Sequence, residues 1–183
     1  MSHIKKNDLS AEVFDATGVL SAKCYQCGKC SAGCPMAGEM DYPPSMILRL
    51  LQTGIDLNDK KVLSSKSIWY CLTCGTCISR CPQEVDIPVL MDHLRELSIE
   101  RNLVNDDAKK ILAFHESFLA SINNTGRLHE IGLIANYKMK TLDLMQDVML
   151  APTMYAKGKL PIFPEKIKDI KNIKSIFSKT KKK

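Results

Sequence analysis

The sequence has no long run of apolar residues. Its uninterrupted apolar stretches, such as Ile111 to Ala113, span only a few positions, whereas a transmembrane helix needs roughly 18 or more. We therefore expect no membrane span. The opening residues, Met-Ser-His-Ile-Lys-Lys-Asn-Asp, also lack the apolar segment and the small-residue cleavage site of a secretory signal. These absences predict a cytoplasmic location.

Features that would indicate several other functions are missing as well. The sequence contains no glycine-rich loop of the kind that holds phosphate groups, and no strand-like alternation stands out. It has no recognisable nucleic-acid-reading helix and no aromatic stacking platform. The formal net charge is +6, but many of the lysines lie in the C-terminal quarter. The positive charge therefore belongs to the tail, and we expect no nucleic-acid partner.

What the sequence does contain is eight cysteines in two equivalent segments. Reduced cytoplasmic cysteines at regular spacing bind metal more often than they form disulfides. Both segments follow the pattern C-x2-C-x2-C-x3-C-P and indicate an internal duplication. They read Cys24-Tyr-Gln-Cys27-Gly-Lys-Cys30-Ser-Ala-Gly-Cys34-Pro35 and Cys71-Leu-Thr-Cys74-Gly-Thr-Cys77-Ile-Ser-Arg-Cys81-Pro82.

This pattern is the signature of bacterial ferredoxins with two [4Fe–4S] clusters. In that signature three closely spaced thiolates bind one cluster, and the fourth, followed by proline, reaches the other cluster. Carried over to this sequence, the signature predicts two [4Fe–4S] clusters with crossed ligands. One cluster would be held by Cys24, Cys27, Cys30 and Cys81, and the other by Cys71, Cys74, Cys77 and Cys34.

A zinc site is the alternative for each Cys-x2-Cys pair. A zinc ribbon needs only two such pairs and would leave the third and fourth cysteines of each run unused, so we prefer the clusters. Gly28 and Gly75 follow the second cysteine of each run, where a missing side chain lets the backbone approach a cluster. Trp69 and Tyr70, just before Cys71, either shield a cluster from water or pack in the core.

The segments around the cysteines have helical patterns, and the interval between the two runs is too long for the compact two-cluster ferredoxin. We therefore expect an all-α fold, an α-helical ferredoxin-like domain with two [4Fe–4S] clusters plus a C-terminal helical extension. Capping, proline and apolar-spacing signals predict the individual helices. They are a helix capped by Ser10 that ends near Gly18, a helix over 45–53 after Pro43 and Pro44, a helix from Asn58 to Tyr70, and a helix over 89–101.

The sequence divides into three predicted regions: an N-terminal helical segment (1–22), the two-cluster helical ferredoxin domain (23–100), and a helical extension with a basic tail (101–183). In the third region we expect helices from Asp106 or Asp107 to Ile122 and over 128–138, the second continuing as far as 150. Extended pieces should follow at Pro152, Pro161 and Pro164. Isoleucines spaced among lysines predict a final basic amphipathic helix. We prefer docking of another subunit for this helix over a membrane surface or a solvated extension.

The two cysteine runs, the Ser67-Ile-Trp-Tyr lead-in to Cys71 and the stretch from His115 to Glu130 together carry a family resemblance over about residues 20 to 135. The sequence resembles the C subunit of the cytoplasmic heterodisulfide reductase of methanogenic archaea. That resemblance implies an electron-relay subunit of an oxidoreductase complex, with no catalytic residue of its own. The A subunit, with flavin and iron–sulfur clusters, would deliver electrons, and the B subunit would reduce the mixed disulfide of coenzymes M and B in methanogenesis. Hydrogenase or formate dehydrogenase would supply the electrons.

Two other functions are compatible with the cysteine motifs. One is the iron–sulfur subunit of another dehydrogenase, of the glycolate, lactate or glycerol-phosphate type, although those usually fuse the domain to a longer cysteine-rich region. The other is a nucleic-acid-binding iron–sulfur protein, which the missing reading helix disfavours.

Overall fold

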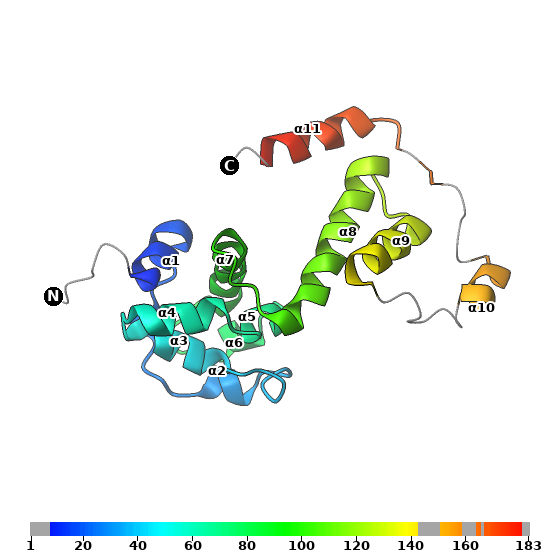
Figure 1. Ribbon diagram of the computed structural model, residues 1–183. Helices are drawn as coiled ribbons and strands as arrows, with labels where there is room; N and C mark the ends of the chain where they lie inside the picture. Colours follow the sequence, from blue (N-terminus) through cyan, green and yellow to red (C-terminus); the bar gives the residue numbers. More distant parts are fainter. Residues whose placement is uncertain (1–7, 143–150, 159–163, 166, 181–183) are drawn as a thin grey trace. The chain divides into compact units, whose positions relative to one another are not determined.

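The structure, a computed structural model, describes residues 8–142, 151–158, 164–165 and 167–180. All regular secondary structure in these residues is helical (Figure 1), which confirms the predicted all-α fold. Two compact units divide the chain, Met1–Lys109 (unit 1) and Lys110–Lys183 (unit 2). Within the described ranges, no helix combines the length and the hydropathy that crossing a membrane requires.

Unit 1 is built around its longest helix, α7 (Ile87–Glu100), which packs against several of the other helices of the unit (Figure 1). It contacts α1, α4, α5 and α6, while α2 packs on both α3 and α6. The remaining elements of unit 1 are α1 (Leu9–Thr17), η1 (Ser21–Lys23), α2 (Lys29–Ala32), α3 (Pro44–Gln52), α4 (Asp56–Leu63), α5 (Ser67–Tyr70), α6 (Thr76–Ser79) and η2 (Asp106–Ala108).

The sequence of α7 explains why this helix forms and why it is central. Asp86 caps its first turn by accepting a hydrogen bond from the N–H of Val89 at 3.2 Å, and Pro88 stands where a missing N–H costs nothing. Apolar side chains three or four residues apart then form one buried face. Leu90 and Leu94 are fully buried there, and each such side chain contributes about 1.5–3 kcal/mol to stability.

The start of α1 differs from the prediction. Ser10 is not the cap; Asp8 is, with its carboxylate accepting the N–H of Ser10 at 3.0 Å. The Ser10 hydroxyl instead bonds the Ser21 hydroxyl at 2.5 Å. Both residue types favour the cap position, and with Asp8 as the cap the buried Leu9 is the first residue of the helix. The helix ends at Gly18, as predicted, in a left-handed conformation with φ 72°.

The single helix predicted up to Tyr70 is also wrong, because a turn at 64–66 separates α4 from α5. The cause is the carboxylate of Asp41, which accepts hydrogen bonds from the Ser65 hydroxyl at 2.6 Å and the Ser67 N–H at 3.1 Å. It also accepts from the Ser67 hydroxyl at 2.5 Å. An acceptor from outside the helix thus satisfies the first backbone donors of α5, so a new helix starts there.

Unit 2 contains α8 (Lys109–Thr125, beginning at the boundary), α9 (Glu130–Thr141), α10 (Ala151–Ala156) and α11 (Ile170–Thr180). The rings of Phe114 and Tyr137 meet edge to face at 6.1 Å and join α8 to α9. Contrary to the predicted extended piece, Pro152 lies in the first turn of α10, where proline is tolerated. The predicted final amphipathic helix is present as α11. The continuation of α9 to 150 and the break at Pro161 lie outside the described residues.

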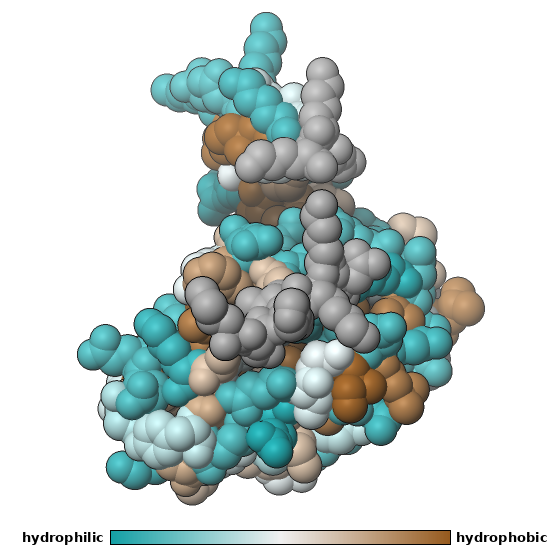
Figure 2. Space-filling view, turned by 90° about the vertical axis from the view of Figure 1, so that its left-hand side faces the viewer, coloured by the Kyte–Doolittle hydropathy of each residue, from teal (hydrophilic) through white to brown (hydrophobic). Residues whose placement is uncertain are grey.

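The surface presented in Figure 2 is mostly hydrophilic, with separate apolar residues between the polar ones. Exposed apolar side chains of unit 1 include Phe14, Met46 and Leu57, each on a different helix. Such scattered side chains are normal for a folded domain.

We expect D41A to destabilise unit 1 by about 1–2 kcal/mol, because the turn between α4 and α5 loses its acceptor. Burial alone would raise the pKa of Asp41, but the bonds from Ser65 and Ser67 outweigh it and lower the pKa. A lowered pKa contributes stability above the unfolded-state value and loses it as pH falls through the folded-state value, so the contribution is present at neutral pH. Anaerobic thermal melts should show a lower Tm than wild type.

The matched control is D15A, which removes an exposed aspartate of α1. An equal fall in Tm for D15A and D41A would contradict the role given to Asp41.

Candidate functional site

The two cysteine runs begin with the same local structure. Cys24 ends η1 with φ −75° and ψ 117°, and Cys71 ends α5 with φ −63° and ψ 119°. The N–H of each cysteine bonds a carbonyl of the turn before it, Ser21 at 3.1 Å and Ser67 at 3.2 Å. The duplication seen in the sequence therefore extends to the backbone before each run.

The same correspondence continues through the runs. Two residues after the first cysteine, Gln26 and Thr73 have positive φ values of 62° and 51°. Gly28 and Gly75 follow with φ values of 76° and 75°, and they begin the short helices α2 and α6. A left-handed conformation at this position explains the glycine in both runs, because glycine adopts it without steric cost. The repeated reversals turn the chain between successive cysteines.

The fourth cysteine of the first run lies with the second run. Cys34 lines one cavity together with Cys71, Cys74 and Cys77. Prolines and apolar side chains from α3, α7 and the segment after Cys34 complete its walls: Pro35, Met36, Met40, Pro44, Leu72, Ile87 and Pro88, with Thr76. The structure thus brings together the four residues that the signature assigns to one cluster.

The fourth cysteine of the second run lies with the first run. Tyr25 has a raised pKa, first because of desolvation and then because of the negative charges of Cys27, Cys81 and Cys24. These three cysteines therefore lie within electrostatic range of one exposed phenol. Burial, and then the charge of Cys24, raises the pKa of Cys30. The four residues assigned to the other cluster are neighbours as well.

The burial of these thiols fits ligation by a cation. Burial, followed by the charges of Cys71 and Cys30, raises the pKa of Cys77 to about 11. Burial also raises the pKa of Cys71, with further contributions from Cys34 and Asp92, opposed by Arg95. Such thiols stay protonated at neutral pH unless a metal replaces the proton. Four cysteines in each group, deprotonated on binding, suit iron–sulfur clusters, which supply one-electron transfer when bound.

No three His, Cys, Asp or Glu side chains in the described ranges stand close enough to hold one metal ion. Within each group of four cysteines, the side chains are therefore not all close enough to bind one shared ion.

Several hydrogen bonds reach the sulfur atoms directly. The Gln26 amide donates to Cys24 Sγ at 3.6 Å, and the Val85 N–H donates to Cys81 Sγ at 3.4 Å. Cys74 Sγ lies 3.4 Å from the Thr76 hydroxyl, which lowers the pKa of Cys74. Hydrogen bonds to cluster sulfurs are one of the ways in which a protein adjusts the reduction potential.

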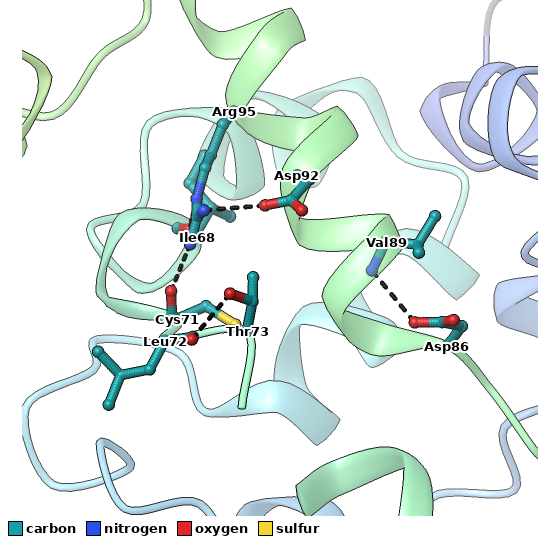
Figure 3. Close-up of polar contacts among 8 residues, drawn as sticks. All are labelled: Ile68, Cys71, Leu72, Thr73, Asp86, Val89, Asp92 and Arg95. Carbon is teal, nitrogen blue, oxygen red and sulfur yellow. Dashed lines mark hydrogen bonds and ion pairs between the residues drawn. The ribbon is translucent and has the colours of Figure 1, made fainter. Parts of the chain in front are cut away.

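Two residues that sequence reasoning missed hold the backbone at the start of each run. The Gln52 amide, at the end of α3, donates to the carbonyls of Ser21 at 2.8 Å and Cys24 at 2.6 Å. Arg95 of α7 donates to the carbonyls of Ile68 and Cys71, each at 2.5 Å (Figure 3). No motif marks either residue, because each belongs to a helix remote in sequence from the carbonyls that it binds.

Of the two aromatic residues before Cys71, Trp69 is buried, with 5% of its surface exposed. Its position in the core of unit 1 favours the packing role. Tyr70 is half-buried, and the Lys66 ammonium lies 5.5 Å from the centre of its ring.

Comparison with known families defines the class of this protein. Residues 21–85 match the family described as "4Fe-4S dicluster domain". The matched segment contains all eight cysteines, so the predicted cofactors, two [4Fe–4S] clusters, are confirmed. The chain is an iron–sulfur protein.

The resemblance to the C subunit of heterodisulfide reductase is also confirmed. The chain is 40% identical over 78 residues to the second iron–sulfur C subunit of the CoB–CoM heterodisulfide reductase of Methanocaldococcus jannaschii, covering 43% of this chain and 40% of the relative. It is 33% identical over 109 residues to the corresponding C subunit of Methanopyrus kandleri, covering 59% of this chain and 55% of that relative. It is 36% identical over 81 residues to the C subunit of the ferredoxin:CoB–CoM heterodisulfide reductase of Methanosarcina acetivorans, covering 44% of this chain and 31% of that relative. The chain therefore spans about half, or less, of the length of these relatives.

We expect the full chain, purified without oxygen, to contain about eight irons and about eight acid-labile sulfides, since two four-iron clusters are bound. Metal and sulfide analysis, together with an EPR spectrum after dithionite reduction, checks this. A zinc-containing chain without labile sulfide would contradict it.

Proposed function

We propose that this chain is the electron-transfer subunit of a heterodisulfide reductase complex. It relays electrons through its two clusters from an A subunit that carries flavin and iron–sulfur clusters to a B subunit that reduces the mixed disulfide of coenzymes M and B. That reduction consumes two electrons and two protons and yields two thiols, while each cluster carries one electron at a time. Hydrogenase or formate dehydrogenase supplies the electrons, and the complex lies in the cytoplasm.

The main support is the match to proteins named as the C subunit of heterodisulfide reductase, together with the 4Fe-4S dicluster match over residues 21–85, which hold all the cysteines. The site adds a second reason. All eight cysteines stand in the two groups described above, so no cysteine is left for thiol chemistry on a substrate. The chain's residues position clusters, and we assign no catalytic residue to it. Disulfide reduction then belongs to a partner.

We also propose the crossed ligand sets for the clusters. Cys24, Cys27, Cys30 and Cys81 hold one cluster, and Cys71, Cys74, Cys77 and Cys34 hold the other. The shared cavity around Cys34 and the charges around Tyr25 support this assignment. Crossing makes the segment 23–100 one domain, because each run is incomplete without the other. The preceding segment (1–22) and the extension (101–183) then flank it.

The crossed sets predict a crossed pattern of damage. In C34A the thiols of Cys71, Cys74 and Cys77 should become open to alkylation by iodoacetamide, while those of the first run stay protected. C81A should expose Cys24, Cys27 and Cys30 instead. Mass spectrometry of the alkylated peptides measures both patterns, and damage confined to the run that carries the substitution would rule out the crossing.

A tagged full chain, purified anaerobically from the organism that encodes it, should retain the A and B subunits of heterodisulfide reductase. Adding the chain to a complex depleted of it should restore reduction of the mixed disulfide. The variant C74S, which lacks one ligand, serves as the control and should restore much less. Retention of a flavin-dependent dehydrogenase in place of the A and B subunits would assign the chain to that enzyme.

A further inference from the structure

The two halves of the duplicated site are held by side chains of different charge. In each half, a side chain from the helix after the run donates to two carbonyls, that of the first cysteine and that of the residue three positions earlier. In the first half this donor is Gln52, which binds Ser21 and Cys24. In the second half it is Arg95, which binds Ile68 and Cys71. A neutral amide and a guanidinium thus occupy the same place.

Arg95 keeps its charge close to the second run. Only 18% of its side chain is exposed, and Figure 3 shows its guanidinium between Asp92 and the carbonyl side of Cys71. Asp92 forms an ion pair with it at 2.8 Å but is 59% exposed. Water screens an exposed charge more than a half-buried one, so the carboxylate offsets the guanidinium only in part.

Other cations near the runs are less favourably placed. Lys23, Lys29 and Arg80 all have exposed side chains, and the ammonium of the half-buried Lys66 lies 5.5 Å from the centre of the Tyr70 ring. Exposed charges interact weakly at physiological ionic strength. The half-buried guanidinium of Arg95, fixed by two carbonyls and a carboxylate, therefore has the stronger effect on its surroundings.

We propose that Arg95 raises the reduction potential of the cluster held by Cys34, Cys71, Cys74 and Cys77, and so biases an electron shared by the two clusters toward that one. Reduction adds one electron and one negative charge to a cluster. A fixed positive charge beside the ligand Cys71 stabilises the reduced form more than the oxidised form. The proposal rests on the proposed relay function and on the crossed ligand sets.

The neutral donors to sulfur do not remove this difference. The Gln26 amide bonds to Cys24, the Val85 N–H bonds to Cys81, and the Thr76 hydroxyl bonds to Cys74. Each supplies a dipole, whose field falls off faster with distance than that of a net charge. None of them contacts Arg95, so a substitution at that position leaves them in place.

The test exchanges the two donors. R95Q gives the second half the residue type of the first, and Q52R does the reverse. Redox titration of the full chain, followed by EPR, gives the two midpoint potentials. We expect R95Q to shift the reduction equilibrium of one cluster about tenfold toward the oxidised form, which is about 59 mV for one electron. The potential of the other cluster should stay unchanged. Q52R should raise the potential of that other cluster.

Matched variants at exposed cysteines, C27S and C74S, assign each signal to its cluster. R95K keeps the charge with a different shape, so it should retain more of the wild-type potential than R95Q does. A role for Arg95 limited to holding the backbone would instead give the two variants equal potentials, and would overturn the proposal.

D92N keeps the test decisive if R95Q loses a cluster. It leaves Arg95 intact and removes the counter-charge, so the potential of the second cluster should rise. An unchanged potential in D92N, or in R95Q with both clusters present, refutes the electrostatic role. Neither result bears on the relay function, which the retention of the A and B subunits and the disulfide assay decide separately.

Discussion

The packing of α2 against α6 is the contact on which the rest of the site depends. These two short helices carry Cys30 and Cys77, and the other six cysteines, all proposed ligands, lie close to them in the same two runs. The runs lie far apart in sequence, and joining them closes a long loop at an entropic cost. Helices α3, α4 and α5 offset that cost by burying apolar side chains on the way. The long interval that rules out a compact ferredoxin thus supplies part of the core of unit 1.

The cysteine pattern and the helical periodicity are local signals, so the sequence alone was sufficient to predict the all-α fold, the two clusters and the amphipathic helix α11. The features that the sequence did not predict depend mostly on contacts between residues that are distant in sequence. Asp41 divides a predicted helix because it meets Ser65 and Ser67, 24 and 26 residues away. Gln52 binds the carbonyl of Cys24, 28 residues away in the sequence, and Arg95 binds the carbonyl of Cys71, 24 residues away. The Ser10 error was local, since two suitable cap residues stood two positions apart.

Duplication explains why the two halves share their backbone so closely. The left-handed positions at Gln26 and Thr73, and at Gly28 and Gly75, are determined by the shape of the run itself. The side chains that approach from the following helices are not constrained in this way, because any donor of sufficient length satisfies the same carbonyls. An amide and a guanidinium therefore bind equivalent pairs of carbonyls, although they differ in charge. Divergence at these positions can change the electronic properties of a site while its geometry is preserved.

The second cysteine of each run is exposed, whereas the other six are half-buried or buried. Cys27 and Cys74 therefore mark two places where little protein separates a cysteine of the site from solvent. Electron tunnelling weakens steeply with distance, so in the proposed relay a partner that docks over one of these thiols would have a short route to the cluster beneath it. An exposed ligand would also leave a bound cluster accessible to dioxygen, so a neighbour that covered the thiol would protect the cluster as well as exchange electrons with it.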